Sequence, residues 1–245
     1  MGREPHRDDD LGDHRLNDRG LKALETVTVE TGPNPTFSII WMHGLGADGH
    51  DFEPLVPELI AGGMPALRFV FPHAPVRPVT INNGYQMRAW YDIIGIDRRS
   101  TEDFAGIQAS ADAIRQLIRT ENSRGVASSR IALAGFSQGG AMALHVATRY
   151  PEKLAGVIAL SCYLPLAKDF ATQRTAANLA TPVFMAHGTQ DPVVPFTLGD
   201  ESRRILEGTG YHVQWHTYPM PHSLCEPEVA DIRGFLGRVT LSQIS

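Results

Sequence analysis

Cysteine is scarce in this chain of 245 residues, which contains only Cys162 and Cys225. Two cysteines at this spacing predict neither a disulfide framework nor a zinc site, so no metal is expected. Long apolar runs are also lacking, and none approaches the ~20 residues that a membrane-spanning helix requires. The N-terminus has no apolar core of the kind found in signal peptides. We therefore expect no stable membrane insertion and a cytoplasmic location.

An excess of positive charge is absent as well. The chain has 22 Lys and Arg against 27 Asp and Glu, a formal net charge of −5. Nucleic acids and anionic membranes favour basic surfaces, so neither is expected as the main partner. Residues 1–20 are dense in charged residues and histidine and poor in apolar ones, which predicts a flexible polar tail. Residues 21–245 are expected to form one domain.

Beyond the tail, short apolar runs alternate with segments of helical periodicity. Most of the runs are continuous, which is typical of strands that are buried on both faces. Strands that alternate with helices predict an α/β fold with a mostly parallel sheet between two layers of helices. Functional sites in such sheets form at the carboxyl ends of the strands. The predicted strands are Val27–Val29, Phe37–Met42, Leu67–Phe71, Ile131–Ala134, Val157–Leu160, Val183–Ala186 and Val213–Tyr218.

Two capping-box patterns mark where helices are expected to begin. Ser100 with Asp103 predicts the start of a long helix, and Ser223 with Glu226 predicts the start of the last one. The segment between residues 160 and 183 has room for one extended loop and one short helix. Residues 72–100 are rich in Pro, Gly and Asn, which favours a loop. Neither segment predicts a large helical cap domain.

The clearest chemical motif follows the strand Ile131–Ala134. It reads Gly135-Phe136-Ser137-Gln138-Gly139 and leads into a predicted helix. A serine at a sharp turn between a strand and a helix is typical of a nucleophile elbow, where glycines relieve crowding around a strained backbone. The motif alone also fits a strand–helix turn without chemistry, but its position between strand and helix favours Ser137 as a nucleophile.

Two further loops carry candidates for the acid and the base. Enzymes with such an elbow place the acid after the serine and the histidine last. Asp191 follows the strand Val183–Ala186, and His222 follows Val213–Tyr218. We predict that His222 is the general base and that Asp191 orients it. His187 precedes Asp191, which breaks the order, and is interpreted as a residue that shapes the loop; Asp200 is expected within a helix.

An early strand ends in the glycine-rich segment His43–Gly49. This segment and the residue after the nucleophile are where such enzymes place two backbone N–H groups that stabilise an oxyanion. The corresponding donors here are the N–H groups of Leu45 and Gln138. A phosphate-binding loop is excluded, because the glycine spacing fits neither phosphate-binding motif.

Taken together, these segments resemble the phospholipase/carboxylesterase family of α/β-hydrolases. The resemblance implies the α/β-hydrolase fold, with Ser137, Asp191 and His222 as the triad and Leu45 and Gln138 at the oxyanion hole. It implies that no cofactor is used and that the substrate is a small acyl ester, a lysophospholipid or an S-acylated protein. A homodimer is also implied, because members are often dimers. The matching stretches are His43–Phe52, Phe71–Pro75, Met87–Asp92, Gly135–Ala141, His187–Pro195 and Pro221–Ser223.

Some alternatives remain open at this stage. Trp90 and Met87 are candidate walls of the acyl pocket, but a tryptophan at this position is as readily a core residue. The fold can also serve a catalytically silent module that binds a ligand, although the complete triad argues against this. A hydrolase that uses Cys225 is disfavoured, because this residue is expected at a helix start and not at an elbow.

Overall fold

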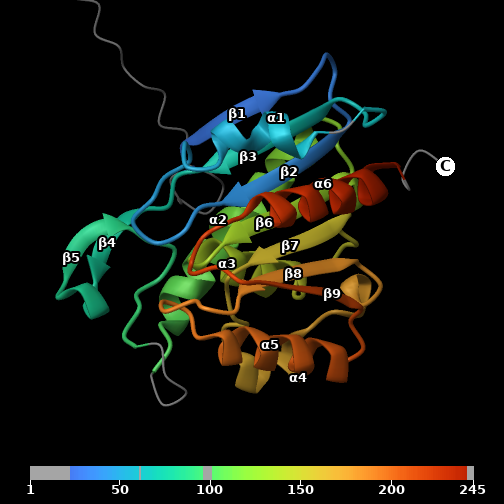
Figure 1. The fold of residues 1–245 in the computed structure, drawn as a ribbon. Coiled ribbons are helices and arrows are strands. Elements are labelled where there is room, and N and C mark those ends of the chain that lie inside the picture. The colour runs from blue at the N-terminus through green and yellow to red at the C-terminus, as the bar shows by residue number, and fades with distance from the viewer. Residues whose placement is uncertain (1–22, 61, 96–100, 242–245) are drawn as a thin grey trace, which may run out of the picture.

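The computed structural model describes residues 23–60, 62–95 and 101–241. The polar tail predicted for residues 1–20 and the capping residue Ser100 lie outside these ranges. The described residues form a seven-stranded sheet with helices on both faces (Figure 1). Its strands are β1 (Thr26–Glu30), β2 (Phe37–Met42), β3 (Leu67–Pro72), β6 (Ile131–Phe136), β7 (Gly156–Leu160), β8 (Val183–Gly188) and β9 (Val213–Tyr218).

The strand order is β1-β3-β2-β6-β7-β8-β9, and all seven predicted strands are present. Only β1 is antiparallel to its neighbour, and the other pairs are parallel. The carboxyl ends of the parallel strands therefore meet at one edge, on the left in Figure 1. Strands β2, β7 and β8 are buried along their whole length, which explains their continuous apolar runs.

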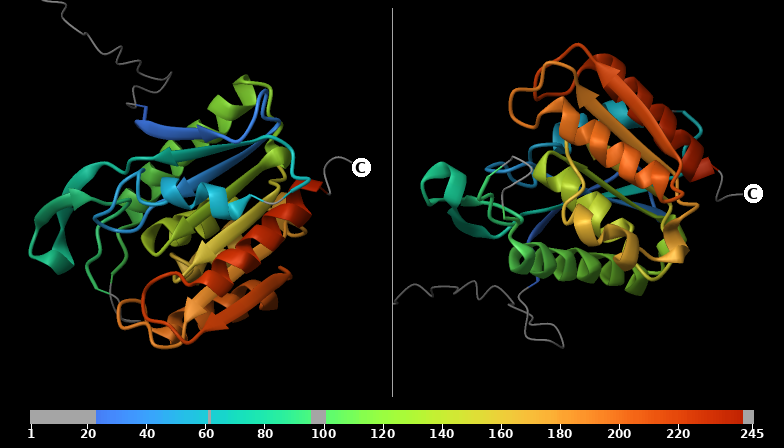
Figure 2. Two further views of the ribbon diagram at one scale, coloured as in Figure 1. Left: turned by 45° about the horizontal axis from the view of Figure 1, so that its top comes forward. Right: turned by 90° about the horizontal axis from the view of Figure 1, so that it is seen from below.

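The helices divide between the two faces of the sheet (Figure 2). Residues of α2, α3, α4 and α5 pack on one face, and residues of α1 and α6 pack on the other. These two layers exclude water from both faces of the central strands, as the fold class requires. The helices are α1 (Val56–Leu59), α2 (Phe104–Ser123), α3 (Gln138–Ala147), α4 (Phe170–Gln173), α5 (Phe196–Gly208) and α6 (Glu226–Leu241).

Two predicted helix starts are wrong by a few residues. Helix α2 begins at Phe104, because the side chain of Asp103 is itself the N-cap and accepts a hydrogen bond from the N–H of Gly106. Helix α6 begins at Glu226, so Ser223 lies too far upstream to cap it. In α2 an acidic residue, Asp103, thus provides the cap that the pattern assigned to a serine.

The segment 72–100 contains a hairpin that the loop prediction missed. Strands β4 (Val76–Val79) and β5 (Tyr85–Arg88) pair antiparallel, and the hairpin projects from the carboxyl edge of the sheet (Figure 1). Asn83 and Gly84 have positive φ angles of 55° and 74°, which reverse the chain. The turn-forming residues therefore connect two strands here, where the composition alone suggested irregular structure. Within the described ranges, no helix is both long and apolar enough to cross a bilayer.

Candidate active site

Ser137 lies at the carboxyl edge of the sheet, between strand β6 and helix α3. Its φ and ψ angles are 54° and −120°, a conformation that residues other than glycine seldom adopt. The turn is held on both sides, because the N–H of Ser137 donates to the carbonyl of Leu160 at 2.8 Å and its own carbonyl accepts from Ala141 at 3.0 Å. Strain of this kind is concentrated at functional sites. The geometry is that of the predicted nucleophile elbow.

The glycines of the motif are required by the close approach of three segments. A Cβ atom on Gly139 would collide with the carbonyl oxygen of Met42 at the end of β2. A Cβ atom on Gly135 would collide with the backbone of Gly139 across the turn. The elbow thus packs directly on the strand that leads into the predicted oxyanion loop. No side chain fits at either position.

Asp191 and His222 meet at the ends of the neighbouring strands β8 and β9. The Nδ1 of His222 and the Oδ2 of Asp191 are 2.6 Å apart. The other carboxylate oxygen, Oδ1, accepts hydrogen bonds from the N–H groups of Val193 and Val194 at 2.8 and 2.9 Å. The Asp191 side chain is fully buried, whereas that of His222 is 14% exposed. The carboxylate is therefore fixed, and its partner imidazole leaves Nε2 available for another group.

The ring of Phe136 places this imidazole beside the elbow. Phe136 immediately precedes Ser137, and its ring centroid lies 4.7 Å from that of His222. Ser137 and Asp191 are 54 residues apart in the sequence, and Asp191 and His222 are 31 apart. The loops that carry these three residues are thus brought together at one edge of the sheet. The structure thus brings His222 and Asp191 into contact, next to the turn that carries Ser137.

The glycine-rich segment after β2 lies against the elbow. A Cβ atom on Gly44 would be 3.5 Å from the Cβ of Ser137. The hydrogen bonds found within the described ranges do not use the N–H of Leu45 or that of Gln138, the first residue of α3. Both predicted oxyanion donors therefore remain available. The N-terminal end of α3 adds a favourable electrostatic environment for negative charge.

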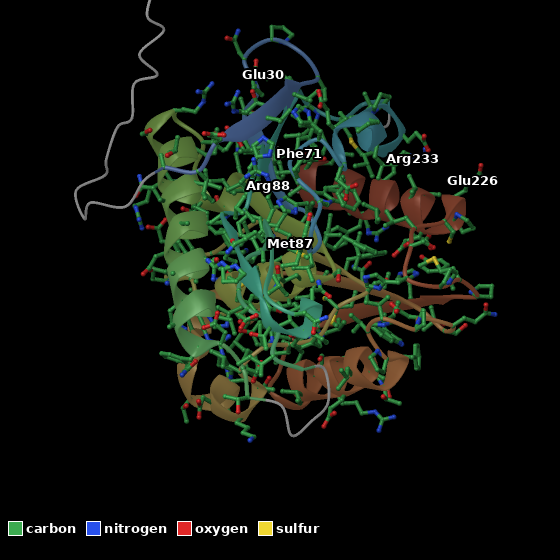
Figure 3. All side chains as sticks on the ribbon, turned by 90° about the vertical axis from the view of Figure 1, so that its left-hand side faces the viewer. Glu30, Phe71, Met87, Arg88, Glu226 and Arg233 are labelled. Carbon is green, nitrogen blue, oxygen red and sulfur yellow. The ribbon has the colours of Figure 1, made fainter. Side chains whose placement is uncertain are left out.

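The two candidate pocket walls have different surroundings. Trp90 is fully buried, and its indole Nε1 donates to the carbonyl of His43 at 2.9 Å. The structure thus favours the core alternative for this residue. Met87 lies on β5, on the face viewed in Figure 3, and its sulfur is 3.7 Å from the Cβ position of Gly46. Met87 therefore sits beside the oxyanion loop, as a wall residue would.

His43 is a site residue whose role the sequence analysis missed. It is 1% exposed, and both of its ring nitrogens have hydrogen-bond partners. Burial lowers its pKa to about 4, so the ring is neutral near pH 7. Its position at the end of β2, directly before the glycine-rich loop, was the signal that could have indicated a structural role.

The other residues considered from the sequence have partners of their own, and His187 also lies beside the proposed triad, with its Nε2 3.5 Å from Oδ2 of Asp191. His187 is buried at the end of β8, where its Nε2 contacts the carbonyl of Val194 at 2.9 Å, and desolvation lowers its pKa. Asp200 lies on α5 and pairs with Arg203 and Arg204. Cys225 lies just before α6. In the part of the chain that the structure covers, no three His, Cys, Asp or Glu side chains are grouped to hold a metal ion.

Known proteins resemble this chain over most of its length. The sequence profile of the phospholipase/carboxylesterase family matches residues 24–240. An acyl-protein thioesterase 1 from Mycosarcoma maydis is 38% identical over 91% of this chain and 100% of its own length. An acyl-protein thioesterase 1 from Neurospora crassa is 43% identical over 82% of this chain and 86% of its own. The crystal structure of Zea mays acyl-protein thioesterase 2 aligns with a TM-score of 0.78 and 26% identity, over 89% of this chain and 99% of that one.

Proposed function

Because the chain belongs to the phospholipase/carboxylesterase family of α/β-hydrolases and is a serine hydrolase of esters or thioesters, we propose that Ser137, His222 and Asp191 are its catalytic triad. We propose further that S-acylated proteins are its main substrates. The observation that carries the first proposal is the 2.6 Å contact of His222 with the buried Asp191, next to the strained turn at Ser137.

The proposed reaction begins at the Ser137 hydroxyl, which is a weak nucleophile until a base removes its proton. His222 Nε2 takes that proton as Oγ attacks the acyl carbon, and Asp191 stabilises the imidazolium through Nδ1. The C–S bond then breaks, the proton passes from His222 to the leaving thiolate, and an acyl-serine remains. Water attacks this ester with His222 again as base. The products are a carboxylic acid and a regenerated Ser137.

Negative charge develops on the acyl oxygen in both steps. Gln138 directly follows Ser137, and Leu45 directly follows Gly44, whose Cβ position is 3.5 Å from the Cβ of Ser137, so the N–H groups of Leu45 and Gln138 are suited to bind this oxygen. Loss of one such donor typically lowers turnover by ~10²–10³-fold. The positive end of α3 acts in the same direction.

The preference for thioesters is supported by the relatives and by the leaving group. Two curated proteins that match most of this chain are named acyl-protein thioesterases. A cysteine thiol has a pKa of ~8.5, so a thiolate leaves with little help from an acid. Protonation of the leaving thiolate by His222 alone is therefore sufficient for cleavage of the C–S bond. Small acyl esters and lysophospholipids are the other substrates that the same chemistry allows.

The triad is tested with purified Ser137→Ala, with Ser223→Ala as a matched control in the His222 loop. We expect Ser137→Ala to remain folded and to lose ~10⁶-fold in turnover of a p-nitrophenyl ester. It should also no longer react with a fluorophosphonate probe, whereas Ser223→Ala should be labelled like the wild type. Turnover above a few per cent in Ser137→Ala would show that the nucleophile is another residue. Failure of the wild type to be labelled or to turn over would favour the silent ligand-binding module.

The substrate class is tested by comparing kcat/KM for three compounds with the same acyl chain. These are an S-acyl cysteine in a peptide, the oxygen ester of a serine in the same peptide, and a lysophosphatidylcholine. We expect the thioester to be hydrolysed fastest. A higher kcat/KM for the lysophospholipid would assign the enzyme to lipid hydrolysis and leave the triad unaffected.

A further inference from the structure

Two buried side chains, His43 and Trp90, connect the segments that carry the two oxyanion donors. The His43 ring lies directly before the glycine-rich loop. Its Nε2 is 3.0 Å from the backbone N of Ala74, and its Nδ1 is 2.7 Å from the carbonyl oxygen of Gly44. The N–H of Ala74 can only donate, so Nε2 must be the unprotonated acceptor. The proton is therefore on Nδ1, which donates to Gly44.

This hydrogen bond determines the direction of the Leu45 N–H. The Gly44 carbonyl accepts from the His43 ring and also from the N–H of Ala47 at 3.3 Å. In a planar trans peptide the N–H points away from the carbonyl oxygen. Because the carbonyl of Gly44 is held toward His43 and Ala47, the N–H of Leu45 must point in the opposite direction within the peptide plane. A flipped peptide would remove this donor and present a carbonyl oxygen in its place.

Trp90 links the same loop to the second donor. Its indole Nε1 donates to the carbonyl of His43 at 2.9 Å. The indole and the imidazole of His43 are tilted toward each other, with ring centroids 5.4 Å apart. The backbone N–H of Trp90 donates to Oε1 of Gln138 at 2.7 Å, and Nε2 of Gln138 donates to the carbonyl of Tyr91 at 2.8 Å. One chain of hydrogen bonds thus runs from the loop of Leu45 through Trp90 to Gln138.

We propose that His43 and Trp90 are positioning residues that hold the N–H groups of Leu45 and Gln138 at the separation and direction needed to bind the oxyanion. His43 sets the orientation of the Gly44–Leu45 peptide, and Trp90 sets the distance between the loop and the start of α3. Neither side chain touches the substrate. This role deepens the proposed function and rests on it, because it requires an oxyanion to form on the substrate at Ser137.

Three variants test the two connections separately. Trp90→Phe keeps a flat buried ring and removes the donor to the His43 carbonyl. His43→Asn keeps a donor near the position of Nδ1, whereas His43→Gln keeps an acceptor near that of Nε2 and loses the donor to Gly44. Misplacement of a catalytic group by 1 Å can lower the rate by ~10². We expect kcat to fall ~10-fold in Trp90→Phe and ~10²-fold in His43→Gln. The loss of kcat in His43→Asn should be smaller than in His43→Gln. The KM of all three variants should stay within about threefold of the wild-type value.

A trifluoromethyl ketone separates this role from a purely structural one. Ser137 adds to its carbonyl and forms a hemiketal oxyanion, so its affinity reports the donors directly. The inhibition constant should rise by the same factor by which kcat/KM falls in each variant. Trp41→Phe is the matched control, because Trp41 is also buried and its Nε1 has no hydrogen-bond partner in the described structure. This control should keep kcat and the inhibition constant within about twofold of the wild type.

All rates are normalised to the number of sites that a fluorophosphonate titrates, which removes misfolded protein from the comparison. The proposal is overturned if Trp90→Phe and His43→Gln match Trp41→Phe in kcat per titrated site. It is also overturned if His43→Asn is as impaired as His43→Gln, or if KM alone changes. Failure of the proposed function looks different, because the wild-type enzyme would then form no adduct with the ketone and Ser137→Ala would retain turnover.

Discussion

Glu228 is a carboxyl group whose burial makes stability depend on pH. It lies in the first turn of α6 and is 0% exposed, and the apolar residues of this helix pack against the sheet. Neither carboxylate oxygen has a hydrogen-bond partner in the described structure. Burial raises its pKa from 4.5 to about 8, with a smaller increase from the charge of Asp231. The backbone of Cys225 acts in the opposite direction but is too weak to offset desolvation.

The sign of the effect follows from the direction of this shift. The folded chain binds the Glu228 proton more tightly than the unfolded chain does, so its contribution to stability is complete below pH 4.5 and is lost as the pH rises through about 8. Each pH unit in this window corresponds to about 1.4 kcal/mol. Between about pH 5.5 and pH 8 the wild type should therefore lose about 3 kcal/mol of unfolding free energy through this group.

Glu228→Gln removes the titration while keeping the size of the side chain. The free energy of unfolding of this variant and of the wild type is measured in urea at about pH 5.5 and about pH 8. We expect the difference between variant and wild type to be about 3 kcal/mol more favourable to the variant at the higher pH than at the lower one. Glu226→Gln, on the exposed side of the same turn (Figure 3), should show the same pH dependence as the wild type. A difference between Glu228→Gln and the wild type that stays constant within about 0.5 kcal/mol would refute the assignment of a raised pKa.

Three further outcomes follow from the site and the fold. Asp191→Asn should lower turnover of a p-nitrophenyl ester by ~10⁴-fold, because an amide favours the wrong tautomer of His222; a loss below tenfold would count against the triad. Gly139→Ala should destabilise the protein by about 1–3 kcal/mol in urea unfolding, because its methyl group meets the backbone of Met42. Gly234→Ala in α6, whose new Cβ would be 3.6 Å from Arg238, should be neutral or stabilising, and equal losses in both variants would contradict the packing argument. Because the described ranges contain no large helical cap, the rate on a soluble ester should pass smoothly through its critical micelle concentration, and an abrupt rise there would reveal a mobile lid.

The sequence by itself determined the strands and the chain order of the proposed triad residues. Central strands of a parallel sheet are buried on both faces, so their continuous apolar runs can be read from neighbouring residues alone. The elbow is equally local, because Gly135, Ser137 and Gly139 lie within five residues. Asp191 and His222 were predicted because each follows a strand, and the carboxyl ends of parallel strands meet at one edge.

The tertiary structure alone decided how the oxyanion loop is held and where several polar groups lie. His43, Ala74, Trp90 and Gln138 are 31 to 48 residues apart where they bond, and no periodicity links residues at such distances. Local pattern likewise could not show that Trp90 is a core residue. The same holds for Glu228, because its burial depends on how α6 packs against the sheet. A side chain's hydrogen-bond partners are set by which segments the fold brings together, and the sequence carries that information only through the complete packing of the chain.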